Sequence, residues 1–383
     1  MIGPDKSRAW MEIDLDAVAW NYRETVKAVG PAVGVMAVVK DESYGLGAVP
    51  IARRLAGEGC ELFCVADLRE ALELREAGIT GRILMLLPVP MAYLETAADY
   101  RIEFLVLSAD QAEAYDNAAA ALGKTATAHI KLDIGLGRLG MVVKDREQDV
   151  LEEIRRIAGL KHLQAVALLG HTTQSALIGG DALNREQLER FIRIAEQVEA
   201  EGFHFERHCL GSAPFADYPE YACDYIRVGA LLYGGLPGTK FPFRPRPALR
   251  MYARVIQVKT LPEGTPISYG PIFHTLRETR VATVALGFSD GLRRSISGGG
   301  CMLLHGRRAP YIGKVTSDFS MLDVTDIPNV REGDIATVFG TDGDLSQTIE
   351  DYAALYPASV AETSASFTGR VPRFYVSEGK TFS

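Results

Sequence analysis

Eight apolar runs, each of strand length, alternate with stretches long enough for a helix over about 220 residues of this 383-residue chain. Two of the intervening stretches, residues 66–78 and 187–200, carry apolar residues at helical spacing. This alternation indicates an α/β domain, and eight such units fit a (β/α)8 TIM-type barrel better than an open sheet. The runs are Val35–Val39, Leu62–Ala66, Ile83–Leu87, Glu103–Leu107, Ala126–Leu132, Leu163–Leu169, Phe205–Leu210 and Ile226–Leu232.

The pattern changes near Pro237. The segment 235–249 is rich in proline and glycine, which is typical of an interdomain linker. Short alternating runs separated by turn residues follow, and they predict an all-β second domain of strands. The N-terminal run Ala9–Ile13 alternates too, and we expect it to pair with that sheet. The predicted domains are therefore 14–237 for the barrel, and 1–13 with 238–383 for the β domain. The C-terminal runs are Met251–Val258, Val281–Leu286, Cys301–Leu304, Met321–Val324 and Ile335–Phe339.

Composition excludes several classes of function. The net charge is −8, so a nucleic-acid partner has no electrostatic support. No apolar run reaches membrane-spanning length, and the first residues lack the apolar core of a signal peptide, so no membrane association is expected. The five cysteines are scattered without a CxxC pair, which gives no indication of zinc. We expect a cytoplasmic protein with reduced thiols.

Lys40 stands directly after the buried run Val35–Val39 and before a polar segment with Tyr44 and two glycines. The carboxyl ends of parallel strands are where α/β enzymes place their chemistry. A partly desolvated lysine there can form a Schiff base with a carbonyl compound. The alternative is a lysine that only extends its ammonium group into solvent from a strand end.

Several separated segments are distinctive, among them RAWMEIDLDAVAWNY (8–22), GVMAVVKDESYGLG (34–47), HIKLDIGLGRLGM (129–141) and RVPR (370–373). They resemble, in the same order, segments of the alanine racemase family, and the resemblance covers nearly the full length. It implies an amino-acid racemase of fold type III that depends on pyridoxal 5′-phosphate (PLP). It also implies an N-terminal barrel, a C-terminal β domain and a homodimer with shared active sites.

The resemblance assigns most of the cofactor site to the barrel. Lys40 matches the Schiff-base lysine and Tyr44 a phosphate-contacting tyrosine. Arg138 matches an arginine that bonds the phenolic oxygen of the cofactor and lies near the substrate carboxylate, and Lys131 matches a lysine that is carbamylated in many members. The remaining matches are two histidines, at His171 beside the cofactor and at His208 behind Arg227, and the phosphate-binding group Ser212, Gly229 and Ala230.

Arg227 and Tyr269 are the matches that bear on the reaction. Arg227 matches the arginine that faces the pyridine nitrogen of PLP in alanine racemases, where a cation keeps that nitrogen unprotonated. Tyr269 matches a second base that reaches the site of the partner subunit. Racemisation needs one base on each face of a planar carbanion, and Lys40 and Tyr269 would form that pair.

Departures from the family pattern concern mainly the substrate side. Ser317 stands where a methionine amide meets the substrate carboxylate, and Ala361 where a tyrosine forms a gate. Several changes remove bulk or a hydroxyl group, so we expect a substrate that can be larger than alanine. The other departures are Asp41, Glu42, Leu46, Ala176, Gly211 and Phe288.

Two other functions occur on the same scaffold. An amino-acid decarboxylase would place a carboxylate at the position of Arg227, and a non-catalytic PLP-binding protein would be a single barrel without Tyr269. Both features favour the racemase.

Overall fold

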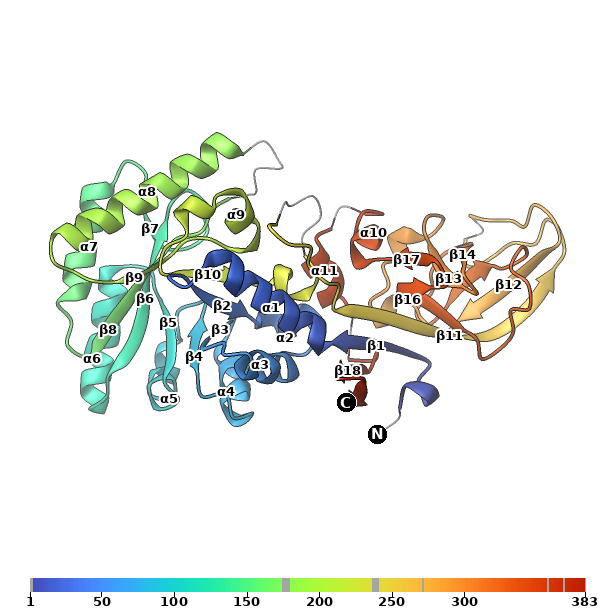
Figure 1. Ribbon diagram of the computed structural model, residues 1–383, viewed down its shortest axis with the longest axis horizontal. Coiled ribbons are helices and arrows are strands. Elements are labelled where there is room, and N and C mark those ends of the chain that lie inside the picture. The colour runs from blue at the N-terminus through green and yellow to red at the C-terminus, as the bar shows by residue number, and fades with distance from the viewer. Residues whose placement is uncertain are drawn as a thin grey trace. The chain divides into compact units, whose positions relative to one another are not determined.

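The computed structural model describes residues 3–173, 180–235, 241–270, 272–356, 358–367 and 369–382. They divide into two compact units, drawn with their labels in Figure 1. The barrel unit comprises the described residues of 19–43 and 48–245, and the strand unit those of 1–18, 44–47 and 246–383. The domain limits expected from the sequence stay predictions, and the one between 237 and 238 lies outside the described residues.

The barrel unit contains a row of parallel strands in the order β10, β2, β3, β4, β5, β6, β8, β9. The two ends of the row also meet, because the Asp224 N–H donates to the Arg207 carbonyl (3.1 Å) and the Arg227 N–H to the Leu210 carbonyl (3.0 Å). These eight strands of the described chain thus form a nearly closed barrel, which confirms the predicted fold. They are β2 (Gly34–Val38), β3 (Leu62–Val65), β4 (Arg82–Met85), β5 (Ile102–Val106), β6 (Ala126–Asp133), β8 (Leu163–Leu169), β9 (Glu206–His208) and β10 (Tyr225–Val228). The two-residue strand β7 (Met141–Val142) pairs with β6.

Helices connect the barrel strands and lie around them in Figure 1. Local signals define their ends: the Asp67 carboxylate caps α4 by accepting from the Glu70 N–H (3.0 Å), and the Ser108 hydroxyl caps α6 by accepting from Gln111 N–H (3.2 Å). Gly123 ends α6 with a φ of +65°, which glycine adopts without strain. The helices are α1 (Leu15–Val29), α3 (Ala48–Gly57), α4 (Leu68–Glu76), α5 (Leu94–Asp99), α6 (Ala109–Leu122), α7 (Glu147–Ala158), α8 (Asp181–Ala200) and α9 (Ser212–Asp217).

The barrel strands are buried on both faces, which explains why they read as continuous apolar runs. Every residue of β3 and β5 is buried. Some residues of these strands are polar or charged and are buried all the same. They are Glu103, His129, Lys131, Asp133, His208 and Arg227.

Two features of the sequence-based assignment were wrong in detail. The last barrel strand ends at Val228 instead of Leu232, because Gly229 leaves the extended region (φ −127°, ψ −82°) and a 3-10 turn follows over Ala230–Tyr233. Lys40 is separated from β2 by Val39 and starts a short turn of its own, α2 (Lys40–Gly45).

The strand unit is built on a mixed sheet in the order β14, β13, β16, β11, β1, β18, β19. The N-terminal strand β1 runs antiparallel to β11 and parallel to β18, as expected for the run Ala9–Ile13. Strand β12 joins β11 to β15. The strands are β1 (Ala9–Asp14), β11 (Leu249–Leu261), β12 (Thr279–Val284), β13 (Cys301–Leu304), β14 (Arg307–Pro310), β15 (Ser320–Asp323), β16 (Ile335–Asp342), β17 (Leu345–Gln347), β18 (Arg373–Ser377) and β19 (Lys380–Phe382).

The strand unit also holds two short helices that the sequence reading did not anticipate, α10 (Ile349–Ala353) and α11 (Val360–Ala365). Each begins at a capping residue: the Thr348 hydroxyl accepts from the Asp351 N–H (3.2 Å), and the Ser359 hydroxyl from the Glu362 N–H (3.1 Å). Helices of five and six residues lack the length for a visible apolar period, so capping was the only signal for them.

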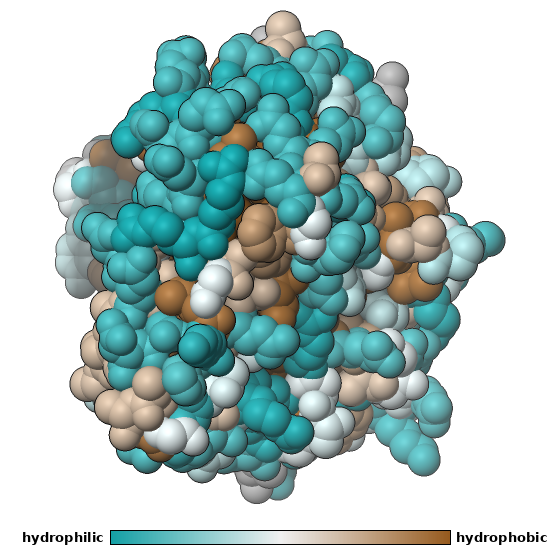
Figure 2. Space-filling view, turned by 90° about the vertical axis from the view of Figure 1, so that its left-hand side faces the viewer, coloured by the Kyte–Doolittle hydropathy of each residue, from teal (hydrophilic) through white to brown (hydrophobic). Residues whose placement is uncertain are grey.

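The surface is largely polar, in keeping with 23% charged residues. Hydrophilic residues predominate on the face in Figure 2, with hydrophobic ones in small groups between them. Across the described residues, no helix combines the length and apolar character needed to cross a bilayer. The same residues hold no group of three or more His, Cys, Asp or Glu side chains arranged to bind a metal.

Candidate active site

The predicted barrel residues come together because each follows the carboxyl end of a different parallel strand. Lys40 follows β2, Arg138 follows β6, His171 follows β8, Ser212 follows β9 and Gly229 follows β10. The carboxyl ends of barrel strands all face one rim, which is where barrel enzymes hold their substrates. The rim of the barrel unit is therefore the candidate site.

Lys40 begins a turn with an unusual backbone. The four residues Asp41 to Tyr44 all have φ between +53° and +55°, the left-handed region that costs non-glycine residues about 1–2 kcal/mol each. Local hydrogen bonds hold the part of this turn in the barrel unit. The Asp41 N–H donates to Glu70 Oε1 (2.6 Å), and Glu42 Oε2 accepts from the Ala48 N–H (3.2 Å). Backbone strain of this kind is found where a site needs one fixed geometry.

Glu70 is a site residue that the sequence reading missed. Its buried carboxylate also accepts from the Ala66 N–H (2.7 Å), so it ties the end of β3 to the turn after Lys40. In the sequence it looked like one of several glutamates on helix α4. The Asp67 N-cap three residues earlier was the available signal, since it fixes which turn of the helix faces the rim.

The Lys40 ammonium lies 2.9 Å from the Asp41 carboxylate. Asp41 is one of the departures from the family pattern, and its charge thus lies beside the lysine. The Glu42 carboxylate instead accepts a hydrogen bond from the Ala48 N–H.

Arg227 is buried in the barrel interior, and its two terminal nitrogens are fully used. NH1 donates to His208 Nδ1 (2.7 Å) and to the His208 carbonyl (2.9 Å). NH2 donates to the Gly170 carbonyl (2.8 Å) and to His171 Nδ1 (3.1 Å). Nε is the remaining donor of this guanidinium, and no described residue accepts from it. Burial lowers the pKa of Arg227, yet a guanidinium stays charged in proteins.

His171 is neutral at this position. Burial, followed by the positive charges of Arg227, Arg138, Lys131 and Lys40, lowers its pKa to about 3. Since the Nδ1 atom accepts from Arg227, the proton resides on Nε2. An uncharged histidine among these basic side chains is suited to positioning them, and the cluster as a whole favours an anionic ligand.

Lys131 lies beneath this cluster, with only 3% of the residue exposed. Its Nζ donates to the Leu132 carbonyl (2.6 Å). Burial, then the charge of Arg227, lowers its pKa from 10.5 to about 7, so a large share of the amine is neutral at neutral pH. A neutral amine is the nucleophilic form that carbamylation by carbon dioxide requires.

Arg138 extends from a glycine-rich turn that follows β6. The turn is fixed by Asp133 Oδ1, which accepts from the N–H groups of Gly135 and Gly137 (both 3.0 Å). Gly140 has a φ of +106°, and a Cβ there would lie 2.4 Å from the Lys131 carbonyl oxygen. The turn therefore needs these glycines, and it leaves the arginine exposed at the rim.

Ser212, Gly229 and Ala230 meet at the rim next to Arg227. The Ser212 hydroxyl accepts from the Gly229 N–H (3.1 Å), which leaves its own hydrogen to donate. Backbone N–H groups and a hydroxyl at such a turn can bind a phosphate without a nearby cation. With the Nε donor of Arg227 and the amine of Lys40, the rim offers groups for the phosphate, the ring nitrogen and the aldehyde of PLP. The residues present therefore fit this cofactor.

Most of the other predicted site residues and departures belong to the strand unit. Tyr269 is 70% exposed, and Tyr44 precedes Gly45, whose carbonyl accepts from Arg373 Nε (2.7 Å). Leu46, counted among the departures near the substrate, is buried at 2% exposure and is a core residue. Ala361 lies in α11. Ala176 lies outside the described residues.

Ser317 lies in a tightly packed turn. Its carbonyl accepts from the Ser289 N–H (3.0 Å), and a Cβ on Gly287 would lie 2.3 Å from that oxygen. The fully buried Asp290 holds this turn through ion pairs with Arg8 (2.5 Å) and Arg370 (3.4 Å). These two arginines belong to the first and last motifs of the sequence, and only the fold shows that one carboxylate joins them.

Two family models match successive parts of the chain. The family described as "Alanine racemase, N-terminal domain" matches residues 13–237, and "Alanine racemase, C-terminal domain" matches residues 248–375. Alanine racemase 2 of Caldanaerobacter subterraneus subsp. tengcongensis is 32% identical over 97% of this chain and 96% of its own length.

Solved structures are similar over the same extent. The alanine racemase of Bacillus anthracis with bound L-Ala-P has a TM-score of 0.90 and 28% identity, covering 100% of this chain and 98% of that one. The alanine racemase of Bartonella henselae with covalently bound pyridoxal phosphate has a TM-score of 0.86 and 27% identity, covering 97% and 100%.

Proposed function

We propose that this chain, which belongs to the alanine racemase family, interconverts the L and D forms of an amino acid with PLP by a two-base mechanism. The observation that carries the proposal is the surroundings of Arg227. Five hydrogen bonds from NH1 and NH2 fix its guanidinium beside two neutral histidines, the fifth being a longer one from NH2 to the Cys209 carbonyl (3.5 Å), and Nε remains to face a ring nitrogen. A fixed cation at a pyridine nitrogen opposes its protonation.

Each residue of the rim has a defined task in this proposal. Lys40 holds the cofactor through its aldehyde, and Ser212, Gly229 and Ala230 bind the phosphate. When bound, PLP supplies the electron-withdrawing system that acidifies the substrate Cα–H. Arg138 would donate to the phenolic oxygen and orient the substrate carboxylate, and Ser317 stays the second predicted contact of that carboxylate.

Two residues move the proton. The Lys40 amine and the Tyr269 hydroxyl would act on opposite faces of the substrate Cα, one accepting a proton while the other donates one. Exchange between L and D forms requires both bases, whereas a non-catalytic PLP-binding protein needs the lysine but no second base such as Tyr269. The decarboxylase alternative also conflicts with the positive charge of Arg227.

A homodimer follows from the same proposal. Tyr269 lies on a segment of the strand unit where Ile272 is 56% and Leu276 is 85% exposed. Apolar side chains with this exposure are better accommodated in an interface. A two-fold dimer would let each Tyr269 serve the barrel of its partner. The cytoplasmic location stays a prediction; the five cysteines are free thiols.

The substrate proposal is an amino acid larger than alanine. It rests on Ser317, Ala361 and Phe288, and on Ala176, which lies outside the described residues. A hydrophobic pocket discriminates by only about 1–3 kcal/mol per methylene group, so the preference should be graded. Ala361→Tyr should shift kcat/KM towards alanine. A wild-type protein that already prefers alanine by a wide margin would refute this part.

The test of the overall proposal is incubation of the purified protein and PLP with separate L-amino acids in D2O, followed by chiral separation and mass analysis. We expect the D-enantiomer with deuterium at Cα and no amine product. Borohydride treatment should leave the cofactor on the peptide that contains Lys40. Formation of an amine, or solvent exchange without the D-enantiomer, would contradict the racemase.

A further inference from the structure

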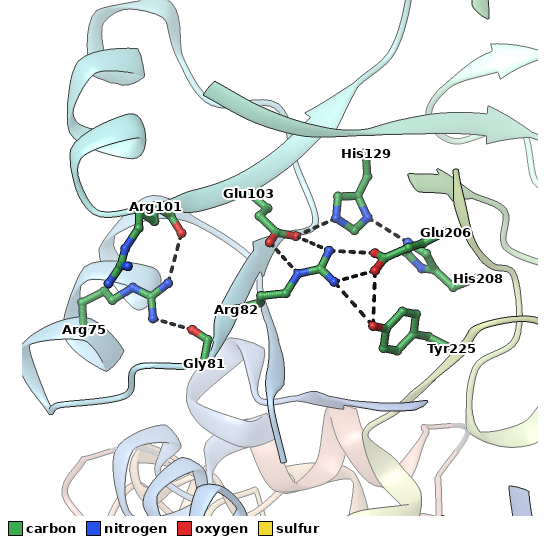
Figure 3. Close-up of polar contacts among 9 residues, drawn as sticks. All are labelled: Arg75, Gly81, Arg82, Arg101, Glu103, His129, Glu206, His208 and Tyr225. Atoms are coloured by element: carbon green, nitrogen blue, oxygen red, sulfur yellow. Dashed lines mark hydrogen bonds and ion pairs between the residues drawn. The ribbon is translucent and has the colours of Figure 1, made fainter. Parts of the chain in front are cut away.

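A line of buried polar side chains crosses the barrel interior from Arg227 to Glu103, and Figure 3 shows its inner part. Arg227 NH1 is 2.7 Å from His208 Nδ1, and His208 Nε2 is 2.8 Å from His129 Nδ1. His129 Nε2 is 2.8 Å from Glu103 Oε2. We call these four residues the buried polar line.

The members of the buried polar line have little access to water. His129 and His208 are 0% exposed, Arg227 is 5% and Glu103 is 7% exposed. A buried polar atom without a partner costs about 1–3 kcal/mol, so the ring nitrogens of the two histidines have to bond to other members of the line and not to water. The hydrogen-bonding capacity of these four side chains therefore determines which ring nitrogens carry a proton.

Only one arrangement of hydrogens satisfies all three bonds. A guanidinium only donates, so His208 Nδ1 must accept from Arg227 and the His208 proton must reside on Nε2. That proton points at His129 Nδ1, which must accept, so the His129 proton resides on Nε2. It is donated to the Glu103 carboxylate, which only accepts when ionised.

The charges at the two ends agree with this arrangement. Burial, and then the charge of Arg227, hold the pKa of His208 well below its ordinary value, so its ring is neutral. Burial alone would raise the pKa of Glu103, but hydrogen bonds from His129 and Arg82 outweigh it and hold that pKa below its ordinary value.

Arg82 fixes the far end of the line. Its guanidinium donates to Glu103 from Nε to Oε1 (2.7 Å) and from NH2 to Oε2 (3.1 Å). It also donates to Glu206 from NH2 to Oε2 (2.8 Å) and from NH1 to Oε1 (2.9 Å), as Figure 3 shows. Glu206 reaches Arg82 and Tyr225, and neither histidine of the line bonds to it. It therefore offers a control carboxylate in the same cluster.

We propose that Glu103 and His129 are positioning residues for Arg227: by fixing the Nε2–H tautomer of both histidines, they keep His208 Nδ1 an acceptor that aims the guanidinium. This inference rests on the proposed function, in which Arg227 faces the ring nitrogen of the cofactor. Glu103 lies near the amino end of strand β5, and its carboxylate bonds to Arg82 and His129, so it would act on the site through His129 and His208.

The direct test is 15N NMR of the histidine rings in the full-length protein with 15N-labelled histidine, assigned with His208→Gln and His129→Gln. In the wild type, Nδ1 of His208 and His129 should show the shift of an unprotonated ring nitrogen, and Nε2 that of a protonated one. The reverse tautomer at either histidine, or a protonated imidazolium, would overturn the proposal. This outcome does not depend on racemase activity.

The functional test compares Glu103→Gln, Glu103→Leu and Glu206→Gln. The amide oxygen of glutamine can still accept from His129 Nε2–H, so Glu103→Gln should keep the tautomers and most of kcat/KM. Glu103→Leu removes the acceptor, so His208 should show mixed tautomers. We expect kcat/KM to fall about 10- to 100-fold, as on loss of a residue that orients a metal-binding side chain through a hydrogen bond. Glu206→Gln should leave tautomers and rate near wild type.

Unfolding of Glu103→Leu would not end the test. The double variant Arg82→Leu/Glu103→Leu removes both charges of this ion pair together, so the half-buried guanidinium is not left with one of its two carboxylates missing. If either leucine variant folds and retains the wild-type tautomers and rate, the proposal is refuted. Equal losses in Glu206→Gln and Glu103→Leu would also refute it, since the effect would then belong to the Arg82 cluster. Absence of any racemisation in the wild type would instead refute the proposed function.

Discussion

Glu70→Gln should destabilise the protein and slow the reaction, because this buried carboxylate holds the backbone beside Lys40. It accepts from the N–H groups of Asp41 (2.6 Å) and Ala66 (2.7 Å). Hydrogen bonds to a charged group contribute about 1.5–3 kcal/mol each, and a neutral one about 0.5–1.5 kcal/mol. The glutamine amide can accept only one of the two and presents its NH2 group to the other. The expected loss of unfolding free energy is therefore about 2–4 kcal/mol.

The same change should lower kcat/KM by about 10- to 100-fold, because the left-handed turn that presents Lys40 loses an anchor. Urea titration followed by tryptophan fluorescence, together with racemisation kinetics, measures both effects. Glu73→Gln is the matched control: it removes an exposed charge from the same helix, so it should change stability by no more than about 0.5 kcal/mol. If the two variants behave alike, Glu70 does not hold the turn and the reasoning fails.

Three further predictions test other parts of the site. In buffer free of carbon dioxide, the Lys131 amine should raise the free energy of unfolding as pH increases from about 7 to 10.5, because the unfolded chain retains the Lys131 proton over this range while the folded chain has lost it. In urea titrations across this range, Lys131→Met should remove the part of the increase that comes from Lys131. A pH profile that the substitution leaves unchanged would contradict the lowered pKa. Ser43 combines a φ of +53° with a buried hydroxyl that finds no partner among the described residues. Ser43→Ala should therefore raise the free energy of unfolding by about 1 kcal/mol, and Ser43→Gly by about another 0.5 kcal/mol because it also relieves the backbone strain. A lower Tm for Ser43→Gly than for Ser43→Ala in thermal unfolding would argue against strain. Lys40→Ala and Tyr269→Phe chains should each be inactive, yet heterodimers refolded from a mixture should regain activity from the one intact site; no recovery would remove the support for a shared site.

The sequence determined the fold class because its signals are local. Parallel barrel strands are buried on both faces, so they appear as short apolar runs, and the helices between them show their own period and caps. Lys40 could be located from the sequence for the same reason, since it directly follows such a run, whereas Arg138 and Gly229 were identified by the resemblance to a known family. The exact end of the last strand was not visible, because a single backbone change at Gly229 decides it.

Only the tertiary structure decided how the site is held. Glu70 reaches Asp41 across 29 residues of sequence, and His129 reaches His208 across 79, so neither contact has a local pattern. Each depends on the closure of the barrel, which brings successive strand ends to one rim and encloses the side chains that point inward. Once enclosed, a polar group must find its partner inside the protein, and that requirement fixes proton positions and backbone strain that no single segment of the chain encodes.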